Sequence, residues 1–318
     1  MSAQDNSKRT ISEPLGQGVT VNFEIERVIV EGETTFQEYI VADTRAYGRV
    51  LFLHHLIQSA EIDECLYHEP LIHPGAIVHG ALKRVLVAGA GEGATMRELL
   101  KYPSIEKIVC VDLDGEIIDV VREHLRPWHE GSFDDPRVEV RIEDAQKTIR
   151  ESKDGEWDMI VLDISDPVEE GPSVDLFTVR FYREVARALA DDGIITMQCG
   201  ELDPADMRIC QTVRTTLLEV FPWVEFMQTY VPSFHSLWGL AMVAKQPKEL
   251  VPADLEQRVA GIEGPLKVYD ANTHRALLNL PKFMREQLER PGKVMTGEGS
   301  ERLITYDVRK SGILGNEG

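Results

Sequence analysis

The chain has 318 residues, of which 43% are apolar and 28% are charged, and these proportions are typical of a folded globular protein. Its 34 Lys and Arg against 54 Asp and Glu give a formal net charge of -20, which disfavours nucleic acid or an anionic membrane as a partner and favours a cationic small molecule. The four cysteines are scattered, the N-terminus has no apolar signal region, and no apolar run approaches the ~20 residues that cross a bilayer. These features predict a cytoplasmic protein.

The pattern along the chain predicts four regions. Residues 1–14 are polar, and we expect them to be flexible. Residues 15–75 largely alternate apolar and polar side chains, which predicts a small N-terminal domain of β-strands. Residues 76–246 alternate apolar strands with segments of helical period, which predicts a parallel sheet covered on both faces. Residues 247–318 are expected to be a helical extension that docks on the sheet domain through the amphipathic stretch 274–288.

The third region determines the expected fold class. Its predicted strands are "RVLVAG", "KIVCVDL", "VEVRI", "DMIVLDI", "GIITMQC", "VEFMQTYV" and "WGLAMVAK". Only "PSFHSL" joins the last two strands, which is too short for a crossover, so they should pair antiparallel. A parallel sheet that ends in an antiparallel hairpin is the methyltransferase variant of the α/β Rossmann-like fold.

A glycine-rich loop follows the first of these strands. In "VLVAGAGEGATMREL", Gly89 and Gly91 stand where small residues let the backbone approach a ligand closely. Asp112 ends the next strand, where a carboxylate accepts hydrogen bonds from both ribose hydroxyls of a nucleoside. Asp144 follows the third strand and is the candidate for an adenine amino group. The alternatives are a tight turn for the glycines and a helix cap for Asp144.

The loop also carries Glu92, which bears on the kind of nucleoside. A carboxylate at this position repels the pyrophosphate of a dinucleotide but attracts a positively charged sulfonium nucleoside. The sequence therefore predicts a ligand of the S-adenosylmethionine class, and Glu92 suggests an amine on the tail of that ligand.

Two further clusters carry candidate side chains. In "VLDISDPVEEGP", Asp163 ends the fourth strand, and Asp166 precedes a proline that favours an extended backbone. The two aspartates can bracket one small volume, or they can cap amides in a turn. Upstream, Glu64, Tyr67 and His68 share one face of a predicted helix, although a half-buried amphipathic helix would have the same spacing. The histidine spacing does not match a zinc motif, and we expect no metal.

Taken in order, these motifs resemble the polyamine aminopropyltransferases, the family of spermidine synthase. The similarity covers residues 20–290 and rests on "IQSAE", "YHE", "GAGEGATMRE", "VDLD", "EDA" and "DISDP". Within the family, the "GEG" loop, "DPVEEGP" and "VPSFHSLWG" look closest to thermospermine synthases and to bacterial triamine and agmatine aminopropyltransferases. The resemblance implies that decarboxylated S-adenosylmethionine, a co-substrate and not a cofactor, donates an aminopropyl group to an amine and leaves as methylthioadenosine.

The resemblance also implies roles for individual residues. Asp163 would be the base that takes a proton from the attacking amine. The residues expected to bind the acceptor are Asp166, Tyr67, His68, Glu64, Phe234 and Trp238. Those expected to bind the donor are Gln37, Gln58, His68, Gly89, Gly91, Glu92, Asp112, Leu113, Asp144 and Ala145.

The acceptor is the most open question. Phe234 lies where spermidine synthases supply a tyrosine that grips the far amine of putrescine, which favours spermidine over agmatine or putrescine. Phe234 and Trp238 also fit ordinary core packing. A methyltransferase of the same fold and a silent polyamine-binding protein are the alternatives from other classes. The family resemblance further implies a homodimer or homotetramer.

Overall fold

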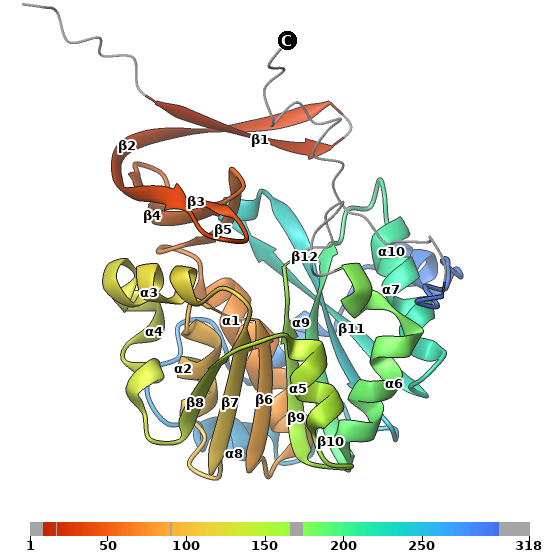
Figure 1. Cartoon of the computed structure of the whole chain (residues 1–318). Helices are drawn as coiled ribbons and strands as arrows, with labels where there is room; N and C mark the ends of the chain where they lie inside the picture. The colour runs from red at the N-terminus through yellow and green to blue at the C-terminus, as the bar shows by residue number, and fades with distance from the viewer. Residues whose placement is uncertain (1–8, 17, 90, 166–173, 299–318) are drawn as a thin grey trace, which may run out of the picture.

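Two β-sheets organise the chain, a small one that lies above a large one in Figure 1. The computed structural model describes residues 9–16, 18–89, 91–165 and 174–298. In this part of the chain the small sheet has five strands and the large sheet has seven. The predicted architecture, a β-rich N-terminal domain followed by a Rossmann-like domain, is therefore confirmed.

The small sheet is an antiparallel meander in the order β1-β2-β3-β4-β5. Its strands are β1 (Thr10–Gly16), β2 (Val19–Glu33), β3 (Glu38–Thr44), β4 (Gly48–Leu53) and β5 (Leu56–Ala60). The prediction of a flexible segment over residues 1–14 is wrong from Thr10 onward. Ile11 pairs with Phe23 of β2, and both side chains are buried in the core of the small domain. This cross-strand burial orders β1, whose own sequence is mostly polar.

The large sheet has the order β11-β12-β10-β9-β6-β7-β8. Its strands are β6 (Arg84–Gly89), β7 (Lys107–Asp112), β8 (Val138–Ile142), β9 (Trp157–Asp163), β10 (Leu189–Glu201), β11 (Trp223–Val231) and β12 (Ser236–Ala244). Strands β6 to β10 are parallel, whereas β12 runs antiparallel to both β10 and β11. The predicted antiparallel hairpin at the end of the sheet is confirmed.

Helices cover both faces of the large sheet. They are α1 (Cys65–His79), α2 (Ala94–Leu100), α3 (Gly115–His124), α4 (Arg126–His129), α5 (Ala145–Glu151), α6 (Val179–Ala188), α7 (Arg208–Leu218), α8 (Leu255–Ala260), α9 (Ala271–Leu277) and α10 (Lys282–Leu288). Three 3-10 turns complete the set, η1 (Ser132–Asp134), η2 (Val174–Phe177) and η3 (Pro232–Phe234).

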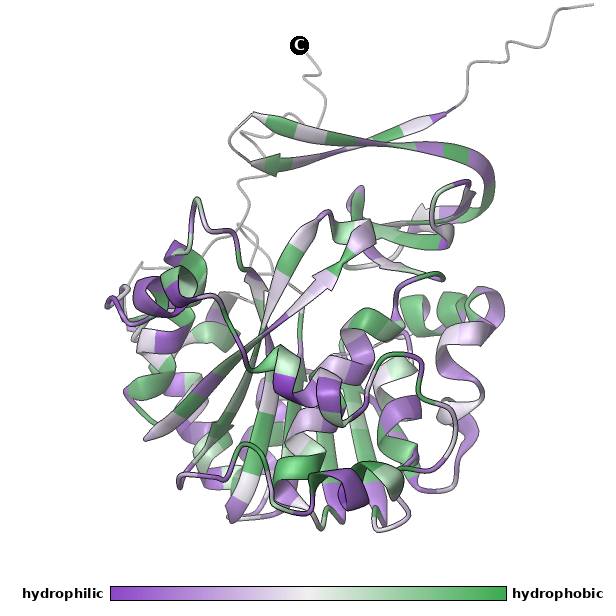
Figure 2. Cartoon of the chain, turned by 180° about the vertical axis from the view of Figure 1, so that it is seen from behind, coloured by the Kyte–Doolittle hydropathy of each residue, from purple (hydrophilic) through white to green (hydrophobic). Residues whose placement is uncertain are grey.

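The central strands β6, β7 and β9 carry continuous apolar runs because both of their faces are buried. In β6, Val85 and Val87 belong to one core, and Leu86 and Ala88 belong to the core on the other side of the sheet. Successive side chains of a strand point to opposite faces, so a strand between two layers of helices needs apolar residues at every position. Figure 2 shows these strands as a largely hydrophobic centre.

Helix α1 belongs with the large sheet, although the sequence analysis assigned residues up to 75 to the small domain. It packs against β10, β11 and α2. Pro70 has no N–H to donate to the carbonyl of Leu66, and this carbonyl accepts instead from the hydroxyl of Thr229 on β11 at 2.6 Å. The proline therefore frees a carbonyl that ties the helix to the sheet.

The C-terminal segment docks on the large domain, as its pattern predicts, and the amphipathic stretch 274–288 falls in two helices, α9 and α10. Pro281 precedes α10 and separates it from α9. Leu277 joins the core on one face of the sheet, and Met284 joins the other core. The carboxylate of Glu69 in α1 accepts three consecutive backbone N–H groups, those of residues 267–269, at 2.7 to 2.9 Å.

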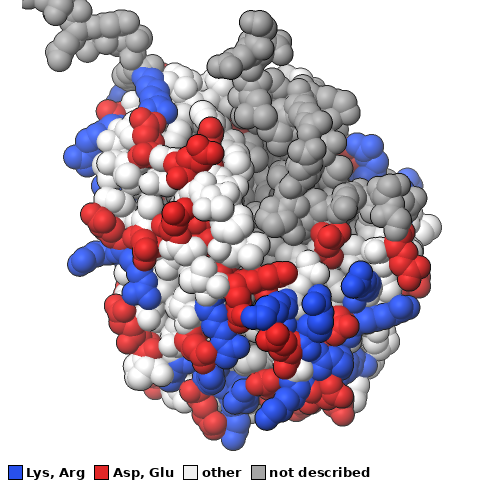
Figure 3. All heavy atoms as spheres, in the orientation of Figure 1, with Lys and Arg blue, Asp and Glu red and all other residues white. Residues whose placement is uncertain are grey.

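Charged side chains of both signs are interleaved on the face shown in Figure 3. Several of them form surface ion pairs, such as Arg187 with Asp154 at 2.8 Å and Lys147 with Glu143 at 2.8 Å. Within the described ranges, no helix is both long and apolar enough to span a membrane.

Candidate active site

The carboxyl ends of three adjacent parallel strands, β6, β7 and β9, bring together Gly89, Asp112 and Asp163. Gly89 lies directly opposite Asp163 in the register of β6 and β9. Its φ is +84°, and a Cβ there would lie 2.0 Å from the carbonyl oxygen of Asp163. Only glycine fits this backbone, so the glycine loop and the predicted base are fixed against each other.

Both carboxylate oxygens of Asp163 receive a hydrogen bond. The hydroxyl of Tyr67, from α1, donates to Oδ1 at 2.6 Å, and the hydroxyl of Thr95, from α2, donates to Oδ2 at 2.8 Å. These two donors orient the carboxylate at the end of β9. Tyr67 was predicted to be near the acceptor, and the structure brings it directly to Asp163.

Thr95 is a site residue that the sequence reasoning missed. Its side chain is fully buried at the second position of α2, just behind the glycine loop. A hydroxyl inside a predicted helix is unremarkable in sequence, because its partner lies 68 positions further along the chain. The signal available was its place in the first turn after the loop.

Asp112 ends β7 beside the loop. Its Oδ1 accepts from the backbone N–H of Asp114 at 2.9 Å, and its Oδ2 lies 3.3 Å from where a Cβ on Gly91 would be. Burial, opposed by backbone hydrogen bonds, raises the pKa of Asp112 to about 6. Leu113, the next predicted donor residue, lines a cavity of about 600 Å³ together with Phe36 and Ile142.

The small domain reaches this edge through the turn between β2 and β3. Gln37 donates from Nε2 to Oδ2 of Asp114 at 2.9 Å, and the Thr34 hydroxyl donates to the same oxygen at 2.6 Å. Gln37 is thus held at Asp114, two residues beyond Asp112 in the chain, and its predicted contact with the donor stays a prediction. Gln58, half-buried in the middle of β5, donates to the carbonyl of Leu56 at 3.2 Å.

Asp144 is an exposed helix cap in the ligand-free chain. It precedes α5, and its carboxylate accepts from the backbone N–H of Gln146 at 2.8 Å. The alternative interpretation of this residue is therefore present in the structure. Ala145 follows as the first residue of α5 and is partly buried. Nothing in the contacts of either residue tests the predicted adenine contact.

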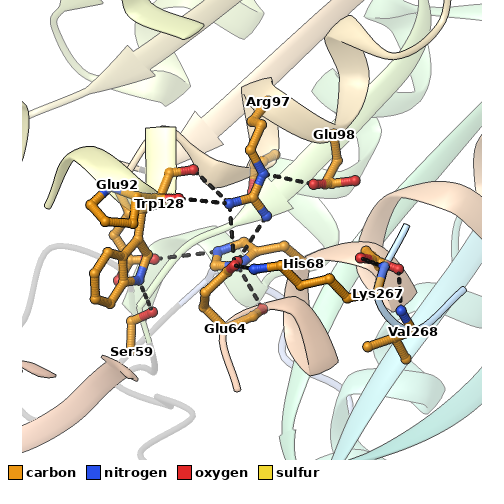
Figure 4. Close-up of polar contacts among 12 residues, drawn as sticks. Ser59, Glu64, His68, Glu92, Arg97, Glu98, Trp128, Lys267 and Val268 are labelled. Carbon is orange, nitrogen blue, oxygen red and sulfur yellow. Dashed lines mark hydrogen bonds and ion pairs between the residues drawn. The ribbon is translucent and has the colours of Figure 1, made fainter. Parts of the chain in front are cut away.

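His68 lies between two carboxylates (Figure 4). Its Nδ1 is 3.1 Å from Oε2 of Glu64, and its Nε2 is 3.3 Å from Oε2 of Glu92. Glu92 therefore points into the site, toward His68 and not toward the surrounding solvent.

Glu64 is not placed to grip an acceptor, which corrects its predicted role. Its carboxylate is buried and receives both terminal nitrogens of Arg97, at 3.2 and 2.8 Å, in addition to His68. Arg97 also donates to the carbonyl of Trp128 at 2.7 Å and to Glu98 at 2.7 Å (Figure 4). With its oxygens engaged in this way, Glu64 positions His68.

An aromatic group lies beside Tyr67. The rings of Tyr67 and Phe234 are 6.0 Å apart, and those of Phe234 and Trp238 are 5.0 Å apart. Asp63, which is buried, accepts from the backbone N–H and the hydroxyl of Ser233 and so fixes the turn that carries Phe234. Among the described residues, the buried Nε1 of Trp238 has no hydrogen-bond partner.

Two remaining predictions concern Asp166 and a metal. Asp166 lies outside the described residues, so its predicted contact with the acceptor stays a prediction. No cluster of His, Cys, Asp and Glu suited to a metal ion occurs in the ranges that the structure describes.

Comparison with known proteins identifies this arrangement. Residues 64–253 match the spermine/spermidine synthase domain, and residues 9–61 match the spermidine synthase tetramerisation domain. The chain belongs to the spermidine synthase family. The boundary between the two matches falls just before α1, where the structure changes from the small sheet to the large one.

Individual relatives agree with this assignment. The polyamine aminopropyltransferase of Aeropyrum pernix is 38% identical over 279 residues, which cover 86% of this chain and 88% of that protein. The crystal structure of spermidine synthase from Thermotoga maritima has a TM-score of 0.81 at 28% identity and covers 91% of this chain and 97% of its own. A spermidine synthase in complex with the transition state analogue AdoDATO gives a TM-score of 0.83, also at 28% identity, with the same coverage.

Membership of the spermidine synthase family confirms the predicted enzyme class, a polyamine aminopropyltransferase. The two alternative functions, a methyltransferase and a silent polyamine-binding protein, are not supported, because the curated relatives are named as polyamine aminopropyltransferases. The acceptor and the roles of single residues are not decided by the family.

Proposed function

We propose that this enzyme transfers the aminopropyl group of decarboxylated S-adenosylmethionine to spermidine, giving thermospermine or spermine and 5'-methylthioadenosine. In this proposal Asp163 is the base, and the donor is a co-substrate, with no further cofactor. The single observation that carries the proposal is the Asp163 carboxylate, held by Tyr67 and Thr95 against the glycine loop.

Free-energy considerations support a base at this position. An alkylammonium has a pKa near 10, so exposing a neutral amine at pH 7 costs about three pKa units, roughly 4 kcal/mol. A positioned carboxylate that takes the proton as the carbon–nitrogen bond forms lowers this cost. The leaving group needs no acid, because a cationic sulfonium departs as a neutral thioether. The site then has to align the two substrates and to remove one proton from the attacking amine.

On the donor side, Asp112 would accept the ribose hydroxyls and Glu92 would pair with the terminal ammonium of the aminopropyl arm. The positions of both carboxylates beside Gly91 and His68 support this assignment. Gln37, Gln58, Leu113, Asp144 and Ala145 would complete the pocket around the nucleoside. Leu113, Asp144 and Ala145 follow the carboxyl ends of β7 and β8, the edge where open α/β sheets bind ligands, and Gln37 contacts Asp114 at this edge.

The aromatic group supports spermidine as the acceptor. Tyr67, Phe234 and Trp238 form a continuous series of rings that begins at Asp163. Such rings attract an alkyl chain and the ammonium groups that it carries. Phe234 offers no hydroxyl to fix the far end of a short diamine, whereas a triamine extends along the whole series.

The assembly would be a homodimer or homotetramer. The match of residues 9–61 to a tetramerisation domain supports this part of the proposal. In Figure 1 the β1 and β2 strands extend away from the large domain.

Acceptor preference is tested by steady-state transfer to putrescine, agmatine and spermidine, with the products separated by chromatography. We expect the highest kcat/KM with spermidine. Phe234→Tyr should raise kcat/KM for putrescine relative to spermidine by about tenfold or more, since one added hydrogen bond to a charged ammonium contributes about 1.5 kcal/mol or more.

The matched control is Phe283→Tyr, the same change at an exposed site on α10, which should leave the ratio unaltered. A wild-type enzyme that prefers putrescine or agmatine would refute the spermidine assignment. Methylthioadenosine released with any of the amines would still be consistent with the family's activity.

A further inference from the structure

His68 is a buried imidazole with hydrogen-bond acceptors on both sides. Its side chain is 2% exposed, and its Nδ1 lies 2.8 Å from the carbonyl oxygen of Glu64 and 3.1 Å from the carboxylate of the same residue. On the other side, Nε2 faces the carboxylate of Glu92 at 3.3 Å. A neutral imidazole carries one N–H and satisfies one of these sides, whereas the imidazolium satisfies both.

The surrounding charges favour the imidazolium. Burial alone lowers the pKa of His68, but the hydrogen bonds and charges of Glu64 and Glu92 outweigh burial and raise it to about 10. Burial likewise raises the pKa of Glu64, and the contacts with His68 and Arg97 overcome this and lower it to about 2. Glu64 therefore stays negative at any pH at which the enzyme works.

Every element packed around His68 contributes to this balance. Glu64 and Tyr67 face His68 from its own helix, and Glu92 faces it from the glycine loop. Arg97 of α2 and Lys267 pair with Glu64, Lys267 at 3.7 Å. The charge of Asp163 acts on Glu92. Arg97 is already shared between Glu64 and Glu98. The remaining partner of Glu92 among these groups is His68.

We propose that protonated His68 is a placeholder for the terminal ammonium of the donor, and that donor binding expels the proton of His68 to solvent. This inference rests on the proposed function, because it requires a donor whose cationic tail pairs with Glu92. Burial raises the pKa of Glu92, and before the donor binds the imidazolium opposes this effect, so that the carboxylate is not left unpaired in a largely buried position.

When the donor enters, two cations compete for one carboxylate. An ammonium beside Glu92 lies close to Nε2 of His68, and a like charge at that range disfavours the protonated ring. After the proton has left, Nδ1–H still donates to Glu64, and the lone pair on Nε2 accepts an N–H of the ammonium. The balance is one donor bound and one proton released, with the donor itself unchanged.

The affinity of the enzyme for the donor should therefore depend on pH. Because binding releases a proton from a group whose pKa lies above neutral, donor affinity increases as the pH rises from 7 to 9, by at most about tenfold per unit. Methylthioadenosine has the same nucleoside but no ammonium. Its affinity should not follow this trend.

Isothermal titration calorimetry in buffers of different ionisation enthalpy measures the number of protons released. At pH 8 the wild-type enzyme should release close to one proton per bound decarboxylated S-adenosylmethionine and close to none per bound methylthioadenosine. His68→Gln should release close to none with either ligand. His55→Gln, which removes a more exposed histidine of the small domain, should behave as the wild type does.

Equal proton release with donor and methylthioadenosine in the wild type would overturn the placeholder role. This comparison needs no variant, so it decides the matter even if His68→Gln fails to fold. A donor that binds without proton release and is then turned over once the amine is added would refute the placeholder and leave the proposed function intact. Methylthioadenosine that binds where the donor does not would refute both.

Discussion

Replacing Asp163 with Asn should lower kcat for aminopropyl transfer by about 10²- to 10⁴-fold, the usual contribution of a positioned general base. The change keeps the shape of the side chain and removes its ability to take a proton. The carboxylate lies at the end of β9, where Tyr67 and Thr95 hold both of its oxygens and so fix its orientation. Single-turnover measurements with saturating donor and spermidine report this loss directly.

Donor binding separates the loss of a base from the loss of a site. Asp163→Asn should bind methylthioadenosine within a few-fold of wild type, because Asp112 and the glycine loop are untouched. Asp158→Asn makes the same change near the opposite end of β9, where the carboxylate accepts the backbone N–H groups of Lys83 and Arg84. Asp158→Asn should lower the free energy of unfolding and leave kcat nearly unchanged. Full activity in Asp163→Asn would exclude Asp163 as the base.

Replacing Asp112 with Ala should raise the KM for the donor by about 10²-fold or more and change kcat much less. Hydrogen bonds to a charged acceptor contribute about 1.5 to 3 kcal/mol each, and the ribose would lose two of them. The substitution should weaken binding of the nucleoside equally in the ground state and in the transition state, because the ribose hydroxyls take no part in the bonds that break and form.

The pH dependence of Asp112 adds a second readout. Burial raises its pKa to about 6, so the carboxyl of the free enzyme gains a proton as the pH falls below this value and accepts hydrogen bonds less well. The wild-type donor KM should therefore rise below pH 6, and this rise should be absent from Asp112→Ala. Glu123→Ala, which removes an exposed carboxylate near the far end of α3, is the control. An unchanged donor KM in Asp112→Ala would remove the ribose contact from the account.

Much of the fold follows from local patterns that the sequence displays. The apolar runs of β6, β7 and β9 were sufficient to predict these central strands, because a strand buried on both faces is apolar at successive positions. The short "PSFHSL" connection was enough to predict the antiparallel β11 and β12 pair. The glycine loop and the strand-end aspartates were likewise predictable, because the carboxyl ends of parallel strands meet at one edge.

The errors concern residues whose partners are distant in sequence. Strand β1 depends on its pairing with β2 and on the burial of Ile11, and neither is visible in its mostly polar segment. Glu64 was assigned to the acceptor because its spacing places it beside Tyr67, but Arg97, 33 positions later, takes its carboxylate. Spacing along a helix indicates a shared face and does not indicate what that face meets.

The most direct test of the account is a crystal structure of Asp163→Asn with decarboxylated S-adenosylmethionine and spermidine both bound. The account predicts that the carbon to be transferred lies beside residue 163, with the amine of spermidine between them along the series of Tyr67, Phe234 and Trp238. An aminopropyl arm that points away from the end of β9, with spermidine bound elsewhere, would contradict it.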